Sequence, residues 1–305
     1  MYSLSVGLDP ETADAYPPLV FAIDKEFCLP LVVAWQSLCD SNEGLASTLS
    51  IQVLNEGLPE GCADYLLWHA DRLGLNVQLK PVTLADIRYP VAFGGVHANY
   101  LRLMIPELLE GLGTVLYLDA DILITGDLRP LLKTELHGAP IAAVRDPVNP
   151  AYRYGRALPG WSRLGLPAER EYFNSGVLLI DTSVCVAEGT FRRALTFIAE
   201  HPEHIRLWDQ DALNWAVADR WERLAAQWNA FPMSSLLSTR WINYTAEELV
   251  PLSQLLAVEN DAAIIHYATP AKPWKGLLPA GGADSLYQHY LRAVRATDFP
   301  EPVGA

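Results

Sequence analysis

The chain has 305 residues, of which 50% are hydrophobic and 19% are charged, a composition typical of a folded globular protein. It carries 36 acidic against 22 basic residues, a formal net charge of −14 at pH 7, which argues against broad binding to nucleic acids or anionic lipid surfaces. Binding of a small anion through a metal ion is compatible with this charge.

The N-terminus and the cysteines narrow the class further. The first basic residue is Lys25, and a start without lysine or arginine is unlike a secretory signal peptide. No apolar run is long enough to span a bilayer, because two aspartates interrupt the best one, residues 114–125. The four cysteines lack CxxC spacing, which favours free thiols in a reducing compartment over disulfides or a zinc site. We therefore predict a soluble cytoplasmic protein.

Regular structure is expected from residue 19 onwards. Residues 1–18 end in two prolines and predict a poorly ordered leader. Short apolar runs then alternate with segments of helical period, the pattern of an open, mostly parallel sheet flanked by helices. Strands are predicted at residues 19–23, 49–54, 75–79, 114–118, 141–144 and 177–180. Helices are predicted at residues 30–38, 66–73, 98–110, 191–200, 211–218 and 284–296, with a kink or restart at Pro106.

One long segment, residues 145–170, has no sustained period and is rich in Pro, Gly, Tyr and Arg. A segment of this length inside a compact domain is usually functional or disordered. Its aromatic residues Tyr152, Tyr154 and Trp161 suit a stacking platform on a lid that closes over a ligand. A loop that packs against the core is the alternative, and the sequence leaves both open.

The sharpest local signal is Asp119-Ala120-Asp121, which follows the apolar run at residues 114–118. Alternate side chains of an extended segment share one face, so both carboxylates can point the same way. Two uncompensated carboxylates in so apolar a setting are costly to ionise together. A divalent cation that prefers oxygen ligands, Mg²⁺ or Mn²⁺, removes that cost. Two solvated turn aspartates are the simpler alternative.

A second polar cluster lies far downstream, where an apolar run ends at His266 and leads into a proline-rich loop that contains Lys272. A histidine at a strand end can complete a metal site with the two aspartates, and its imidazole favours Mn²⁺ over Mg²⁺. Lys272 can place its ammonium group on a phosphate. Taken alone, the segment is better described as a core histidine followed by an ordinary surface lysine.

Three further segments place polar side chains beside predicted strands or at the start of a helix. Asp24 closes the first strand, the usual place for groups that hold a nucleotide. Asn174 and Ser175 precede a buried strand and offer an amide and a hydroxyl group. Asp209 and Gln210 stand in a run of three polar residues, which exceeds what a helix N-cap requires.

Six segments in a fixed order resemble the motifs of glycosyltransferase family 8. In chain order they are ANYLRLMIPELL, VLYLDADILI, YFNSGVLLI, WDQDALN, WNAFP and IHYATPAKPWK. Members of this family include bacterial lipooligosaccharide galactosyltransferases and, more distantly, glycogenin. The resemblance spans residues 19–275 and implies an α/β domain of the glycosyltransferase-A type, with an open, mostly parallel sheet flanked by helices. Residues 276–305 are then a small C-terminal extension, a helix and a tail that pack on this domain.

The resemblance implies a role for individual residues of this sequence. It implies a metal site of Asp119, Asp121 and His266 that holds Mn²⁺ against the donor diphosphate, with Mg²⁺ as the other candidate ion. Asp209 and Gln210 match the catalytic positions at the sugar. The implied donor-binding residues are Ala22 and Asp24 near the uracil, Arg102, Asp119 and Ser175 on the donor, Asp146 and Asn174 at the sugar, and Lys272 on the diphosphate.

Three positions depart from the family pattern. Trp208 stands where relatives have a glutamine on the reacting face of the sugar, Thr269 replaces a glycine near the phosphate, and Glu26 replaces an asparagine near the nucleotide. These departures imply altered contacts to acceptor, phosphate and nucleotide, but they leave the implied metal ligands in place. The basic, aromatic tail that brings some relatives to lipid has no obvious counterpart near the C-terminus.

The resemblance therefore implies a metal-dependent, retaining hexosyltransferase that moves glucose or galactose from a UDP-sugar to a hydroxyl group of a glycan or glycoconjugate. Two alternatives stay open on the sequence alone. One is a catalytically silent UDP-sugar-binding protein, which Trp208 favours and the intact metal motif disfavours. The other is a self-glucosylating protein like glycogenin, which requires an exposed acceptor tyrosine.

Overall fold

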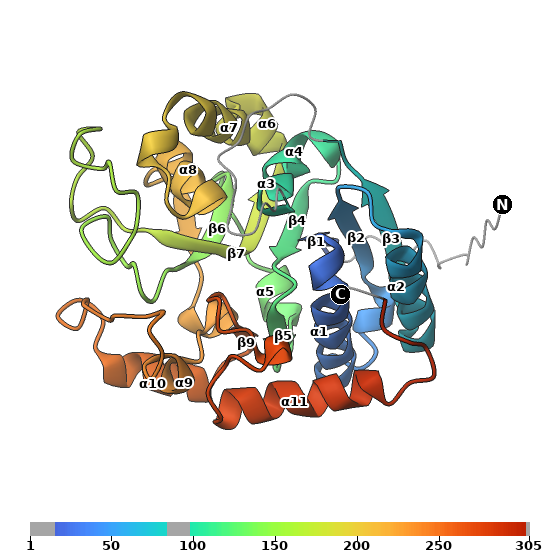
Figure 1. Cartoon of the computed structure of the whole chain (residues 1–305). Helices are drawn as coiled ribbons and strands as arrows, with labels where there is room; N and C mark the ends of the chain where they lie inside the picture. Colours follow the sequence, from blue (N-terminus) through green and yellow to red (C-terminus); the bar gives the residue numbers. More distant parts are fainter. Residues whose placement is uncertain (1–15, 84–97, 303–305) are drawn as a thin grey trace.

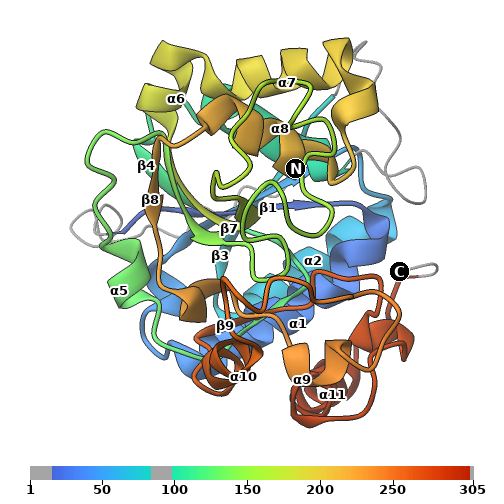
Figure 2. The ribbon, with the colours of Figure 1, turned by 90° about the vertical axis from the view of Figure 1, so that its left-hand side faces the viewer.

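The computed structural model describes residues 16–83 and 98–302 of the chain (Figure 1). Within these residues the strands form one seven-stranded sheet and one two-stranded sheet, and helices cover both faces of the larger one (Figures 1 and 2). Most of the predicted leader, residues 1–15, lies outside the described residues.

The larger sheet is mostly parallel, as predicted. In spatial order its strands are β3 (Asn76–Pro81), β2 (Ser50–Asn55), β1 (Leu19–Ile23), β4 (Thr114–Leu118), β7 (Phe173–Asp181), β6 (Ile141–Arg145) and β8 (Trp221–Arg223). Strand β7 runs antiparallel to β4 and β6, whereas the remaining neighbours pair in parallel. The amino end of β7 therefore lies at the same edge of the sheet as the carboxyl ends of β1, β4 and β6.

Alternating side chains of β1 separate two hydrophobic cores, as the period of an extended chain requires. Leu19, Phe21 and Ile23 belong to the core shared with α1 (Cys28–Ser41), α2 (Glu60–Leu73) and α11 (Gly282–Arg295). Val20 belongs to the opposite core, shared with α3 (Ala98–Leu101), α4 (Ile105–Leu108), α6 (Thr182–Glu188), α7 (Thr190–Glu200) and α8 (Trp208–Val217). Figure 2 shows α6, α7 and α8 on one side of the sheet and α1 and α11 on the other.

Most predicted helices are present, with one change and several additions. Helix α2 ends at Gly74, whose φ of 66° is the left-handed conformation that glycine adopts without strain. The predicted helix at residues 98–110 is instead three short turns, α3, the 3₁₀ turn Arg102–Met104 and α4, with Pro106 in the first turn of α4. The sequence did not predict α5 (Arg129–Leu132), α6, α9 (Met233–Leu236) or α10 (Leu252–Asn260). Among the described helices, none is both long enough and apolar enough to cross a membrane.

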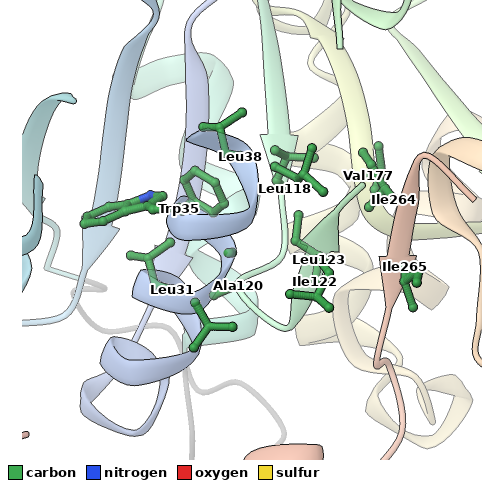
Figure 3. Packing of buried hydrophobic residues seen from close by; sticks show 14 of the residues in the cluster. Leu31, Trp35, Leu38, Leu118, Ala120, Ile122, Leu123, Val177, Ile264 and Ile265 are labelled. Carbon is green, nitrogen blue, oxygen red and sulfur yellow. The ribbon is translucent and has the colours of Figure 1, made fainter. Parts of the chain in front are cut away.

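The two-stranded sheet pairs β5 (Ile122–Ile124) with β9 (Ile264–His266) in antiparallel orientation. Helix α1 holds β5 from its other side, because Ser37 Oγ accepts the Ile124 N–H at 2.9 Å and Ser41 Oγ donates to the Ile124 carbonyl at 2.9 Å. Figure 3 shows apolar side chains of α1, β4, β5 and β9 gathered in one cluster. Each large buried side chain there contributes about 1.5–3 kcal/mol. The segment that follows β4 is therefore fixed from both sides.

Candidate functional site

Asp119 and Asp121 follow the carboxyl end of β4, and the fold brings His266 beside them. Ile122 of β5 lies opposite His266 of β9, and the Tyr267 N–H donates to the Asp121 carbonyl at 2.9 Å. His266 Nε2 lies 3.4 Å from Asp119 Oδ2 and 3.3 Å from Asp121 Oδ1. One ligand atom from each of the three residues lies within 4.8 Å of the other two. The three predicted metal ligands, remote in the sequence, therefore converge.

The shape and charge of this position suit a divalent metal ion. A Cβ atom on Gly176 would lie 2.2 Å from His266 Cε1 and 2.9 Å from Asp119 Oδ2, so only glycine leaves room for the ring and the carboxylate together. Burial lowers the pKa of His266, but the charges of Asp121 and Asp119 outweigh it and raise the pKa to about 9. The two carboxylates thus stabilise positive charge here, whether a proton on the ring or a metal ion. Two carboxylates and one imidazole could hold a divalent ion.

Lys272 adds a second cation to the same carboxylate. Its Nζ donates to Asp121 Oδ2 at 2.5 Å and to the Tyr267 carbonyl at 2.7 Å. Burial raises the pKa of Asp121, but the charges of Lys272 and His266 reverse this and hold the pKa well below its usual value. Asp121 is therefore ionised at neutral pH, and the Lys272 ammonium group lies directly beside it.

Arg102 joins the predicted metal ligand Asp119 to the predicted catalytic residue Asp209. The buried guanidinium lies 2.9 Å from Asp119 Oδ1 and 3.0 Å from Asp209 Oδ2, and it donates to the Ser175 carbonyl at 2.8 Å. The Tyr117 hydroxyl also donates to Asp119 Oδ1, at 2.6 Å. Asp119 therefore directs one oxygen to these donors and its other oxygen toward His266, which fixes its orientation.

Asp209 is a buried carboxyl group of this network whose charge is only partly compensated. It is 3% exposed, and its charged partner is Arg102, which Asp119 shares. Burial raises the pKa of Asp209 to about 6 despite Arg102, which lowers it, and the charge of Asp119 adds to the rise. A carboxyl group with such a pKa can gain or lose a proton near neutral pH, a property that is common at catalytic sites.

The remaining residues predicted at the sugar form one buried hydrogen-bond network. Asn174 Nδ2 donates to Asp146 Oδ2 at 3.1 Å and to Gln210 Oε1 at 3.0 Å. Gln210 Nε2 donates to Asp146 Oδ2 at 3.2 Å, and Gln210 Oε1 accepts the Ser175 N–H at 3.0 Å. The Ser175 hydroxyl lies 3.2 Å from Asp209 Oδ2. The structure thus brings together all five residues, three from the β6–β7 edge and two from α8.

Of the two residues predicted to bind the nucleotide, Ala22 and Asp24, only Ala22 lines the cavity at this site. Ala22 lines a cavity of about 50 Å³ together with Phe27, Asn99, Arg102 and Asp119–Asp121. Asp24 is not among the lining residues, and its Oδ1 accepts the Glu26 N–H at 2.8 Å at the start of the 3₁₀ turn Lys25–Phe27. Glu26 Oε2 in turn accepts a hydrogen bond from Lys275 Nζ at 2.9 Å. The predicted contact between Asp24 and the nucleotide therefore stays a prediction.

The long segment at residues 145–170 is anchored to the core. Tyr152 and Tyr154 are buried, the Tyr152 hydroxyl donates to the Asn214 carbonyl at 3.0 Å, and the Tyr154 hydroxyl contacts Glu248. The Leu158 N–H donates to Asp211 Oδ1 at 2.8 Å. Of the two readings that the sequence left open, these contacts favour the packed loop, because the two tyrosines are not free to stack on a sugar.

Trp208, one of the departures from the family pattern, begins α8 with a φ of 48°. A bulky residue rarely adopts this left-handed conformation, so its surroundings must hold it. Asp211 Oδ2 does so by accepting the N–H groups of Arg206 and Leu207, both at 2.7 Å. A second departure, Thr269, has a local role, because its Oγ1 accepts the Ala271 N–H at 3.3 Å.

Sequence reasoning missed several residues of this site. Asn229 Oδ1 lies 2.8 Å from His266 Nδ1, and Tyr117, Phe27 and Asn99 touch or line the site as described. Tyr117 has a signal, since it lies two residues before Asp119 on the same face of the chain. Asn229 stands within the WNAFP motif, but nothing local in that motif assigns it a partner.

Comparison with known proteins adds a family and a fold. The sequence model of glycosyl transferase family 8 matches residues 18–277. The lipopolysaccharide glucosyltransferase WaaO of Escherichia coli (strain K12) is 29% identical over 273 residues, 87% of this chain and 74% of that protein. General stress protein A of Bacillus subtilis (strain 168) is 29% identical over 209 residues, 67% of this chain and 68% of that protein. The crystal structure of the galactosyltransferase LgtC with donor and acceptor sugar analogs superposes with a TM-score of 0.74 at 23% identity, covering 93% of this chain and 98% of that one. This likeness confirms the predicted glycosyltransferase-A fold.

Proposed function

Because this chain belongs to glycosyl transferase family 8 and is a hexosyltransferase, we propose that it moves glucose or galactose from a UDP-sugar to a hydroxyl group of a glycan or glycoconjugate. The reaction retains the configuration at the anomeric carbon, as the resemblance to the family implies. The name of the relative WaaO, a lipopolysaccharide glucosyltransferase, supports a glycoconjugate acceptor.

One observation carries this proposal. Asp119, Asp121 and His266 converge within 4.8 Å of one another, and Arg102 connects them to Asp209 through two ion pairs of 2.9 and 3.0 Å. A position for a cation thus lies next to a buried carboxyl group and a set of amides. This arrangement suits the transfer of a sugar from a diphosphate, because negative charge develops on the leaving group and positive charge on the sugar.

In the proposed mechanism Asp119, Asp121 and His266 would hold Mn²⁺, or Mg²⁺ in its place. When bound, the ion would supply Lewis-acid stabilisation of the negative charge on the departing UDP. Lys272, now paired with Asp121, supplies a second positive charge to the same phosphates. Ala22 and Asp24 are assigned to the uridine, and the cavity that Ala22 lines beside Asp119 and Asp121 supports this for Ala22.

The sugar is held by the buried network around Gln210. Asp146 and Asn174 are assigned to its hydroxyl groups, and Arg102 and Ser175 keep Asp209 in place through ion-pair and hydrogen-bond contacts. The bond between the anomeric carbon and the diphosphate breaks, the acceptor oxygen forms the new bond from the same face, and a donor phosphate oxygen takes the acceptor proton. Asp209 and Gln210 stabilise the positive charge that develops on the sugar during this step.

The proposal places the reaction in the cytoplasm. All four cysteines are free thiols, and three of them are buried, which agrees with a reducing compartment.

A donor panel tests the proposal. UDP release is measured with UDP-glucose, UDP-galactose and other nucleotide sugars, with and without Mn²⁺, and a candidate acceptor glycan. We expect release with one hexose donor, and its loss in Asp121→Asn but not in Asp127→Asn, an exposed aspartate on the segment after β5. Binding of a UDP-sugar without turnover for any acceptor would support the catalytically silent alternative. Hexose units added to the protein itself, detected by intact mass, would support the glycogenin-like alternative.

A further inference from the structure

Asn229 lies between the metal ligands and the sugar-binding network. It ends the 3₁₀ turn Ala226–Asn229 and is buried, with 1% of its surface exposed. Its Oδ1 lies 2.8 Å from His266 Nδ1, and its Nδ2 donates to Asn174 Oδ1 at 2.9 Å.

The hydrogen bonds around Asn174 decide which way both amides point. The Gly176 N–H can only donate, and it donates to Asn174 Oδ1 at 3.0 Å, which identifies that atom as the oxygen. The NH₂ group of Asn174 then faces the acceptors Asp146 Oδ2 and Gln210 Oε1. Since Asn174 Oδ1 also accepts from Asn229, the NH₂ group of Asn229 must face it and the oxygen of Asn229 must face His266.

This orientation determines how His266 presents its ring. An amide oxygen only accepts hydrogen bonds, so His266 Nδ1 must carry a hydrogen. The neutral ring then has its lone pair on Nε2, the atom that faces Asp119 and Asp121 at 3.4 and 3.3 Å. In the other neutral tautomer the hydrogen is on Nε2, which leaves no lone pair there for a metal ion beside the two carboxylates. That tautomer would also place the lone pair of Nδ1 against the Asn229 oxygen, so that two acceptors face each other.

We propose that Asn229 is a positioning residue for metal binding: it fixes the tautomer and the orientation of His266, and it ties this ligand to Asn174 of the sugar-binding network. The inference rests on the proposed function, in which His266 holds a metal ion. Partners of this kind in the outer shell of a metal site alter metal affinity by roughly 10–100-fold when removed.

Two substitutions separate the contact to His266 from the contact to Asn174. Asn229→Leu has a similar size and removes both contacts. Asn229→Asp keeps an acceptor for His266 Nδ1 and removes the donor to Asn174. If Asn229 acts through His266, Asn229→Leu weakens Mn²⁺ binding by about 10–100-fold and Asn229→Asp binds Mn²⁺ at least as well as the unaltered protein. If both variants lose affinity equally, the link to Asn174 dominates and the proposed action through His266 is wrong.

The experiment measures the dissociation constant for Mn²⁺ in the presence of UDP, from the electron paramagnetic resonance signal of the free ion, without turnover. A double-mutant cycle with His266→Ala makes the result specific, because Asn229→Leu should have no further effect on Mn²⁺ affinity once the ring is absent. Circular dichroism and urea unfolding establish that each variant is folded.

The outcomes distinguish this inference from the proposed function. The inference would be overturned if the effects of Asn229→Leu and His266→Ala on Mn²⁺ affinity simply add, or if folded Asn229→Leu has an unchanged dissociation constant. In either case, UDP release by the unaltered protein would leave the proposed function intact. Absence of Mn²⁺ binding in the unaltered protein would overturn both.

Discussion

Asp209→Asn should make the protein more stable near neutral pH while it removes activity. The carboxyl group is buried and has a pKa of about 6, about 2 units above the value near 3.9 that it has in an unfolded chain. Because each unit corresponds to about 1.4 kcal/mol, ionised Asp209 costs the folded state about 3 kcal/mol. Asparagine carries no charge and avoids this cost, and Arg102 keeps its ion pair with Asp119. We expect a gain of about 1–3 kcal/mol in the free energy of unfolding at about pH 8.

The sign of the pH dependence follows from the direction of the shift. Between about pH 4 and pH 6 the folded state binds the Asp209 proton more tightly than the unfolded state does, so this group makes stability fall as the pH rises through that window. The advantage of Asp209→Asn should therefore be small near pH 4 and complete above pH 6. Asp211→Asn is the matched control on the same helix. Its carboxylate accepts four hydrogen bonds, two of them from the Leu158 N–H at 2.8 Å and the Tyr172 hydroxyl at 2.7 Å, and an amide cannot accept all four. It should lose about 1–3 kcal/mol.

Urea unfolding of the two variants and the unaltered protein, at about pH 4.5 and pH 8 in the presence of a chelator, measures these differences. UDP release should fall by roughly 100-fold or more in Asp209→Asn, as when other groups that stabilise developing charge are removed. An Asp209→Asn variant that is less stable than the unaltered protein at pH 8, or equally stabilised at both pH values, would refute this reasoning about its buried charge.

Three further predictions concern the metal site and the long loop. Gly176→Ala should abolish Mn²⁺ binding measured by calorimetry, because its methyl group would lie 2.2 Å from the His266 ring. Gly61→Ala is the control and should bind Mn²⁺ normally, because a methyl group there meets no atom within 4 Å. Normal binding by both variants would contradict this prediction. Mn²⁺ affinity should rise about tenfold per pH unit between about pH 6 and 8, because His266, with a pKa of about 9, must release one proton to bind the ion. An affinity that does not change with pH would contradict this prediction. So would a heat of binding that is the same in buffers of different ionisation enthalpy. Trypsin should cleave within residues 145–170 equally slowly with and without UDP-glucose and Mn²⁺, because the Tyr152 hydroxyl already contacts the Asn214 carbonyl. Cleavage is followed by mass spectrometry of the peptides. Protection that appears only with the donor would instead support a lid.

Local sequence patterns were sufficient to predict most strands of the larger sheet. The buried strands of the parallel sheet appear as continuous apolar runs, and the predicted strands at residues 19–23 and 114–118 match β1 and β4. The position of Asp119 and Asp121 followed from β4 itself, since polar residues after a parallel strand lie at the ligand-binding edge. Gly74 and Pro106 were informative because their effect on the backbone is local.

Contacts between segments that are remote in the sequence could not be predicted in this way. Strands β5 and β9 have three residues each, too few for a clear period, and their pairing depends on α1 and on the core around them. Asn229 and Asp211 act through bonds to distant residues, His266 in one case and the Leu158 N–H in the other. For Asn229, the family resemblance placed its motif in the chain and the structure supplied its partners.

The long loop between β6 and β7 begins and ends at adjacent points of the sheet. The Asp146 N–H donates to the Tyr172 carbonyl at 2.9 Å, and Ala151 bridges to Glu171, so the two stems are joined before the chain diverges. This makes residues 150–170 a cassette for chimaeras: a loop from another family member, grafted between these stems, should exchange one outer surface while the Mn²⁺ dissociation constant stays unchanged. Such a graft must retain the two docking points on α8 that Tyr152 and Leu158 now occupy.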